Sequence, residues 1–154
     1  EEAGKSWRYV YEWFSKNKLT TNELLVLDTS PYDTRVEADV QQVVLRNRDV
    51  NARFKSPILK QLKNFCHKNN IPFSCKDTFI QDKNKIRKEK GLSLLTLGST
   101  ELGRIVMESK GTIQGTTLQI PTTGYHTVEE TASIKAVKAI LHILSSFYID
   151  NKKA

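Results

Sequence analysis

Apolar positions recur along the chain at two spacings, one typical of helices and the other of strands. Between residues 5 and 17 they stand three or four positions apart, which predicts an amphipathic helix. A short apolar run at residues 23–28 ends in Asp28. Such runs are typical of strands buried on both faces, as in a parallel sheet. The β-branched stretch 36–46 predicts one or two further strands.

Capping signals mark the middle of the chain. Ser56 can cap a helix and Pro57 is tolerated at its first position, so the apolar stripe that follows predicts a helix. Asn69-Asn70 ends this helix, and residues 71–73 lead into another short strand.

The later part of the chain repeats this alternation. We expect a strand at residues 92–97, a helix at 99–109 capped by Thr100, and a strand at 116–120 ended by Pro121. The alternation predicts one domain over residues 1–154, with a layered α/β/α fold and a largely parallel, mixed sheet.

The strongest helix signal begins at Thr127, whose spacing to Glu130 is that of a capping box. Apolar residues then recur at helical spacing, which predicts the buried face of this helix. That face is expected to carry Ile134, Val137, Leu141, Leu144 and Tyr148.

Composition narrows the class of protein. A chain of 154 residues, 38% hydrophobic and 27% charged, suits a globular domain. The net charge of +7 admits a polyanion partner. However, the basic run at residues 83–90 contains no aromatic residue for base stacking, so we interpret it as a solvated loop and expect no nucleic acid partner. Two cysteines predict a reduced, cytoplasmic setting, and the apolar runs are too short to cross a membrane.

Two residues that follow strands could carry chemistry. Asp28 ends one apolar run, and His126 lies six residues after Ile120. At neighbouring strand ends, a carboxylate and an imidazole are plausible ligands for a divalent metal. Alternatively, Asp28 caps a turn and His126 is an exposed loop residue, and spacing alone favours this second interpretation.

The acidic pair Glu1-Glu2 also has two interpretations. One carboxylate could bind a metal while its neighbour takes a proton from water. A charged pair at a chain terminus is more often simply solvated. Because the chain opens without Met, we expect it to be a piece of a longer protein.

Taken in order, these segments resemble the glutamyl, deblocking and tetrahedral aminopeptidases, dinuclear metallopeptidases of which some are called endoglucanases. The matching segments are Glu1-Glu2-Ala3-Gly4, the strand ending in Asp28, the helix 56–70 with Ile71-Pro72-Phe73, the stretch Gly98-Ser99-Thr100-Glu101, and Ile120-Pro121-Thr122-Thr123-Gly124-Tyr125-His126. The resemblance covers nearly the whole chain and preserves the order and approximate spacing of the segments.

The resemblance implies a function and a role for each matching residue. It implies the carboxyl-terminal part of a catalytic domain with the zinc-exopeptidase fold, which removes N-terminal residues from peptides with the help of two zinc or cobalt ions. Glu1 matches the general base, Glu2 and His126 match ligands of one ion, and Asp28 matches a ligand of the other. Thr100 and Glu101 match substrate-side positions. The family also implies a homo-oligomer for the parent protein.

The chain departs from the family pattern at several points. The family's His-x-Asp ligand and bridging Asp precede the Glu-Glu pair, and Ser99-Thr100-Glu101-Leu102 stands where the family reads Gly-Thr-Asp-Ala. We therefore expect this chain alone to bind catalytic metal weakly or not at all and to leave peptides uncut. The alternative functions are a non-catalytic α/β module derived from a metallopeptidase and a basic binding domain.

Overall fold

The computed structural model describes residues 4–149, with the backbone alone at residues 148 and 149. The chain forms two compact units, and the long strands β1 (Thr21–Pro31) and β4 (Ile113–Thr123) each begin in the first and end in the second. Of the described residues, the first unit comprises 4–26, 46–58 and 75–117, and the second 27–45, 59–74 and 118–149. The expectation of a single domain stays a prediction.

The strands form one mixed sheet in the order β1-β4-β2-β3, and β5 also pairs with β4. The shorter strands are β2 (Val43–Leu45), β3 (Phe73–Cys75) and β5 (Thr131–Ala132). Along β1 and β4, Leu24 lies against Gly115, and further on the Tyr32 N–H donates to the Thr122 carbonyl at 2.9 Å. Both strands therefore advance in the same direction and are parallel.

Two other pairs of strands are antiparallel. Val44 of β2 faces Gln119 of β4, and Thr123 at the end of β4 faces Thr131 of β5. The predicted α/β class with a mixed sheet is confirmed.

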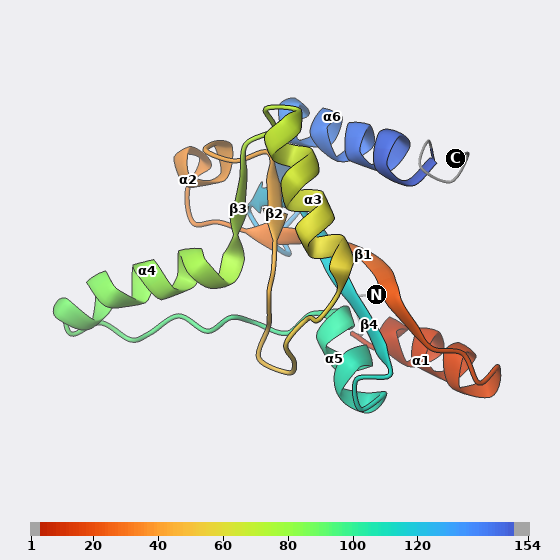
Figure 1. Ribbon diagram of the computed structural model, residues 1–154. Coiled ribbons are helices and arrows are strands. Elements are labelled where there is room, and N and C mark those ends of the chain that lie inside the picture. Colours follow the sequence, from red (N-terminus) through yellow and green to blue (C-terminus); the bar gives the residue numbers. More distant parts are fainter. Residues whose placement is uncertain (1–3, 150–154) are drawn as a thin grey trace. The chain divides into compact units, whose positions relative to one another are not determined.

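In the first unit, α1 (Ser6–Lys16) and α5 (Glu101–Glu108) share a core, and Figure 1 shows α1 in red and α5 in turquoise. Trp7 is buried with Ile105 and Ile113. The helical spacing that predicts α1 thus gives its buried face correctly. A second cluster joins Phe54, Leu102 and Val106. The cap predicted at Thr100 is also confirmed, because its hydroxyl accepts a hydrogen bond from the Gly103 N–H at 3.0 Å.

The segment between α3 (Pro57–Lys68) and α5 differs from expectation. The basic run forms part of α4 (Lys76–Glu89) rather than a loop, and residues 92–97 form no strand. The side chain of Asn84 explains the second difference. Its amide donates to the Leu95 carbonyl at 2.9 Å, and its carbonyl accepts from the Leu95 N–H at 2.8 Å. The backbone is thereby satisfied by a helix side chain instead of a neighbouring strand.

The second unit contains α2 (Arg35–Asp39), most of α3 (Pro57–Lys68), α6 (Ile134–Ile143) and the π-helical turn η1 (Leu144–Ile149). Within it, the Phe65 ring contacts the rings of His142 and Phe147 at 5.5 and 6.0 Å between centroids. Among residues 4–149, no helix is both long and apolar enough to cross a membrane.

Local capping determines where two of the helices begin. The predicted start of α3 is confirmed, since the Ile58 N–H donates to the Ser56 hydroxyl at 3.3 Å. The strand expected over residues 36–46 is only partly correct. Thr34 accepts from the Glu37 N–H at 3.2 Å and starts α2, so only β2 remains as a strand. A good N-cap here outweighs the β-branched composition.

The strand at residues 23–28 exists, but its expected burial and end are wrong. It continues through Asp28 to Pro31 as β1, and Leu27 is more than half exposed. The reason is that β1 lies at the edge of the sheet. Similarly, β4 does not stop at Pro121 but runs to Thr123.

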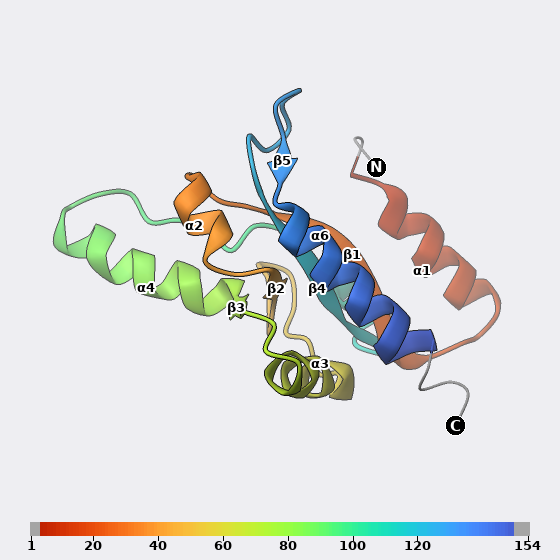
Figure 2. The ribbon, with the colours of Figure 1, turned by 90° about the horizontal axis from the view of Figure 1, so that it is seen from above.

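The last helix begins later and turns a different face inward than the sequence predicts. Ser133 caps it, accepting from the Ala136 N–H at 3.1 Å, and Figure 2 shows α6 directly following β5. Thr127 instead belongs to a turn, where its hydroxyl donates to the Gly124 carbonyl. The buried residues of α6 are Ala136, Ala139 and Ile143, whereas Ile134, Val137 and Leu141 are exposed. The side chain of Tyr148 lies outside the described residues.

Candidate functional site

Asp28 lies inside β1, with its carboxylate directed at the neighbouring strand. One oxygen, Oδ1, accepts from the Thr29 N–H at 2.8 Å, and Oδ2 accepts from the Gln119 side-chain amide at 3.1 Å. The same amide donates to the Thr29 carbonyl at 2.9 Å. Because Gln119 is fully buried, the Asp28 carboxylate is held in one orientation.

His126 lies in the turn between β4 and β5, where its backbone adopts a left-handed conformation with φ of 59°. Its imidazole is exposed and stacks on the Tyr125 ring at 3.8 Å between centroids. Its backbone N–H donates weakly to Glu130 Oε2 at 3.4 Å. Among the described residues, neither ring nitrogen has a hydrogen-bond partner. The ring is therefore available to a ligand from solvent.

Asp28 and His126 belong to the same unit but to different levels of the sheet. Asp28 is bonded to Gln119, four positions before β4 ends at Thr123, and His126 comes after that end. At about 3.3 Å per residue, the end of β4 at Thr123 lies roughly 13 Å beyond the level of Asp28 along the strand direction. The assignment of both residues to one metal site stays a prediction.

The chemistry of these donors suits a hard or borderline metal, since carboxylate oxygen and imidazole nitrogen are the usual ligands of zinc. The Asp28 carboxylate and the His126 imidazole alone are too few ligands for such a site. No set of three His, Cys, Asp or Glu side chains within residues 4–149 is arranged to hold a metal ion. Glu1 and Glu2, the expected base and third ligand, lie outside the described residues.

The two expected substrate-side residues make structural contacts in the first unit. Thr100 is buried, and both its backbone N–H and its hydroxyl donate to Asp49 Oδ2, at 2.7 and 2.9 Å. Glu101 accepts a hydrogen bond from the Ser6 hydroxyl. Their role toward a substrate stays a prediction.

Asp49 is the polar centre that sequence reasoning missed. Its buried carboxylate accepts from the N–H groups of Asn51 and Ala52, at 2.7 and 2.9 Å, as well as from Thr100. It thus fixes both its own turn and the start of α5. The available signal is Asp49 itself, because an Asp side chain often accepts from the backbone N–H two positions later in an Asx turn.

Comparison with known proteins supports the fold and no closer relationship. No protein-family model and no curated protein matches the sequence. Among solved structures, the dodecamer PhTET1-12s matches 94% of this chain with a TM-score of 0.61 at 14% sequence identity. The chain spans 37% of the length of that protein's chain. At this identity the likeness establishes a shared α/β fold, which agrees with the predicted fold class.

Proposed function

We propose that this chain is the carboxyl-terminal part of the catalytic domain of a metal-dependent aminopeptidase. The observation that carries the proposal is the likeness to PhTET1-12s, which extends over 94% of this chain. PhTET1-12s carries TET in its name, and the tetrahedral aminopeptidases are among the enzymes whose ordered motifs this sequence resembles. Because the chain spans 37% of that protein's chain, the proposed activity belongs to a longer parent protein.

In this proposal Asp28, His126 and Glu2 hold the metal ions. The hydrogen bonds to Asp28 from Thr29 and Gln119 orient its carboxylate before a metal arrives. The exposed imidazole of His126 has no competing hydrogen bond among the described residues. Zinc or cobalt at such ligands, when bound, would polarise the peptide carbonyl and supply a nucleophile near neutral pH.

The remaining step is a proton transfer. Glu1 takes a proton from the attacking water and returns it to the amine that leaves when the peptide bond breaks. The proposal assigns Thr100 and Glu101 to the side of the site that receives the substrate, an N-terminal peptide segment. The parent protein forms a homo-oligomer in this proposal, and PhTET1-12s is itself a dodecamer.

The chain by itself is expected to lack this activity. A two-metal site needs about three protein ligands per ion with a shared bridging group, and the proposed set supplies only Glu2, Asp28 and His126. The remaining ligands would come from residues that precede Glu1 in the parent.

A basic binding module is the second candidate, favoured by the helical form of the basic run. On α4, the half-buried Lys83 and the exposed Lys88 stand within one helix. Lys85 is engaged with Asp82 at 2.7 Å. If this helix bound RNA, retention on an RNA column would fall steeply with salt, and Lys88→Gln would weaken it. A non-catalytic module would show neither RNA retention nor metal binding.

The metal content of the parent protein tests the first candidate. We expect zinc to remain bound after dialysis, and His126→Ala to release at least one ion per chain. His67→Ala is the matched control, because His67 is exposed and its ring packs on Phe73 at 5.0 Å. If the two variants retain the same amount of zinc, His126 is not a ligand.

A further inference from the structure

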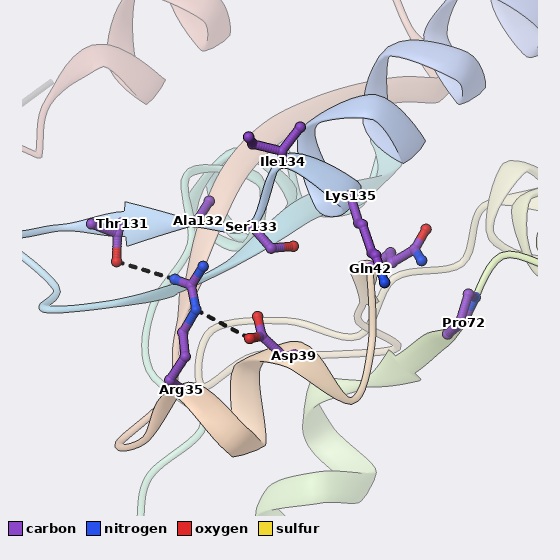
Figure 3. A pocket seen from close by; sticks show the side chains of 9 residues that line it. All are labelled: Arg35, Asp39, Gln42, Pro72, Thr131, Ala132, Ser133, Ile134 and Lys135. Atoms are coloured by element: carbon purple, nitrogen blue, oxygen red, sulfur yellow. Dashed lines mark hydrogen bonds and ion pairs between the residues drawn. The ribbon is translucent and has the colours of Figure 1, made fainter.

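The second unit contains a pocket that is separate from Asp28 and His126. Its volume is about 910 Å³, and α2, Pro72 before β3, and the junction of β5 with α6 line it. Figure 3 shows Arg35 and Asp39 on one wall, and Gln42 with Lys135 on another. All of these residues belong to one unit, so the pocket does not depend on the placement of the other.

The pocket carries an excess of positive charge. The Arg35 guanidinium is held between Asp39 Oδ2, which accepts from Nε at 3.1 Å, and the Thr131 hydroxyl, which accepts from Nη1 at 3.1 Å. Asp39 is thus neutralised by Arg35. Lys135 forms no ion pair with any residue in the described part of the chain. An anion entering the pocket therefore meets one uncompensated ammonium group.

Backbone and amide donors supplement this charge. Ser133 caps the ten-residue helix α6, leaving the N–H groups of Ile134 and Lys135 at its first turn without acceptors inside the helix. The helix dipole favours negative charge at this end. The Gln42 side-chain amide, which also lines the pocket, has no hydrogen-bond partner among residues 4–149.

The same pocket offers apolar surface. Ile134 lines it with a side chain that is 73% exposed, and Pro72 and Ala132 lie on its wall. Contact with an apolar group would remove this surface from water, which favours binding of a ligand that carries such a group. A simple inorganic anion would leave it uncovered.

We propose that this pocket binds small organic carboxylates that carry an apolar group. The carboxylate is received by Lys135, the Gln42 amide and the first-turn N–H groups of α6, and the apolar group covers Ile134 and Pro72. Arg35, already engaged with Asp39, shapes the wall. The proposal involves no metal and none of the residues proposed to bind one, so its failure leaves the proposed peptidase function untouched.

The test is an NMR titration of the chain with N-acetyl-leucine, with N-acetyl-leucinamide as the neutral match. We expect saturable shifts at residues 35, 42 and 131–135, and affinity for the acid about tenfold higher than for the amide, since one charge-assisted contact is lost. Lys135→Gln should weaken binding of the acid about tenfold. Lys138→Gln is the control, because Lys138 is exposed on the same helix but does not line the pocket.

Three outcomes would overturn the proposal. They are equal affinity for acid and amide, equal weakening by the two lysine variants, and no saturable shift at ~20 mM acid, a concentration that would nearly saturate a site with a Kd of ~1 mM. Both lysines are exposed, so neither variant should unfold the chain, and a circular dichroism spectrum checks this.

Discussion

The side-chain amide of Gln119 joins Asp28 to the strand beside it, donating to Oδ2 at 3.1 Å while also donating to the Thr29 carbonyl at 2.9 Å. Gln119 is fully buried, so neither amide hydrogen has water as an alternative. The carboxylate proposed as a metal ligand is therefore oriented by the protein itself.

Replacing this amide should destabilise the fold. Gln119→Leu removes the amide that donates to Asp28 Oδ2 and to the Thr29 carbonyl, and we expect a loss of about 1–3 kcal/mol in the free energy of unfolding. Urea denaturation measures it. Gln61→Leu, on the exposed side of α3, should change stability by less than about 0.5 kcal/mol. Equal losses would mean that the Asp28–Gln119 bond contributes nothing.

The two faces of α6 should respond differently to truncation. Ile143 is 0% exposed and Leu141 is 60% exposed. Ile143→Ala should cost about 2–5 kcal/mol, as truncation of buried side chains does, whereas Leu141→Ala should cost less than about 1 kcal/mol. Thermal or urea unfolding of the two variants measures the difference. A larger loss of stability in Leu141→Ala than in Ile143→Ala would mean that Leu141 lies on the buried face, as the sequence predicts.

The buried carboxylate of Asp49 should be far more important for folding than the exposed one of Asp39. Asp49→Ala removes the acceptor of the N–H groups of Asn51, Ala52 and Thr100, and we expect a loss of about 2–5 kcal/mol. Asp39 pairs with Arg35 at the surface, so Asp39→Ala should cost about 1 kcal/mol or less. Chemical denaturation of both variants measures these losses. Similar losses of unfolding free energy would contradict the role assigned to Asp49.

Elements that depend on local signals are predicted correctly, whereas features set by distant contacts are not. Ser56-Pro57 and Thr100 cap α3 and α5 as expected, because a cap depends on residues only two or three positions away. The burial predicted for β1 is wrong, because no local pattern indicates that β1 lies at the edge of the sheet. On α6, the small side chains of Ala136 and Ala139 face the core, and hydrophobicity alone favoured their larger neighbours.

The candidate site was predicted less completely than the fold. The sequence indicates Asp28 and His126 as metal ligands, and their chemistry suits a metal. Their separation along the sheet depends on where β1 and β4 end, and both strands run past the positions at which the apolar runs stop. The pocket at Arg35 and Lys135 joins segments about a hundred positions apart, so no local pattern indicates it.

The two cysteines should differ in reactivity. Burial raises the pKa of the Cys66 thiol from its ordinary 9.0 to about 11, so at pH 8 only about 0.1% is thiolate. A disulfide reagent at pH 8 should modify the partly buried Cys75, and Cys66 only after unfolding. Cys66→Ala and Cys75→Ala identify which thiol reacts. Rapid reaction of Cys66 in the folded chain would contradict its burial.

The raised pKa of Cys66 also predicts a pH dependence of stability. The folded chain keeps the thiol proton to higher pH than the unfolded chain. Its contribution to the free energy of unfolding is therefore fully present below pH 9.0 and is lost as the pH rises toward about 11. The difference in unfolding free energy between the native chain and Cys66→Ala, followed over this range, should shrink. A constant difference would contradict the assignment.

Hydrolysis of an aminoacyl-anilide by the parent protein tests the proposed function most directly. With zinc or cobalt present, the account predicts steady release of the anilide, its abolition by Asp28→Asn or His126→Ala, and full activity in the control His67→Ala. The 154-residue chain alone should release none. Unchanged turnover in both the Asp28→Asn and His126→Ala proteins, or robust turnover by this chain alone, would contradict the account.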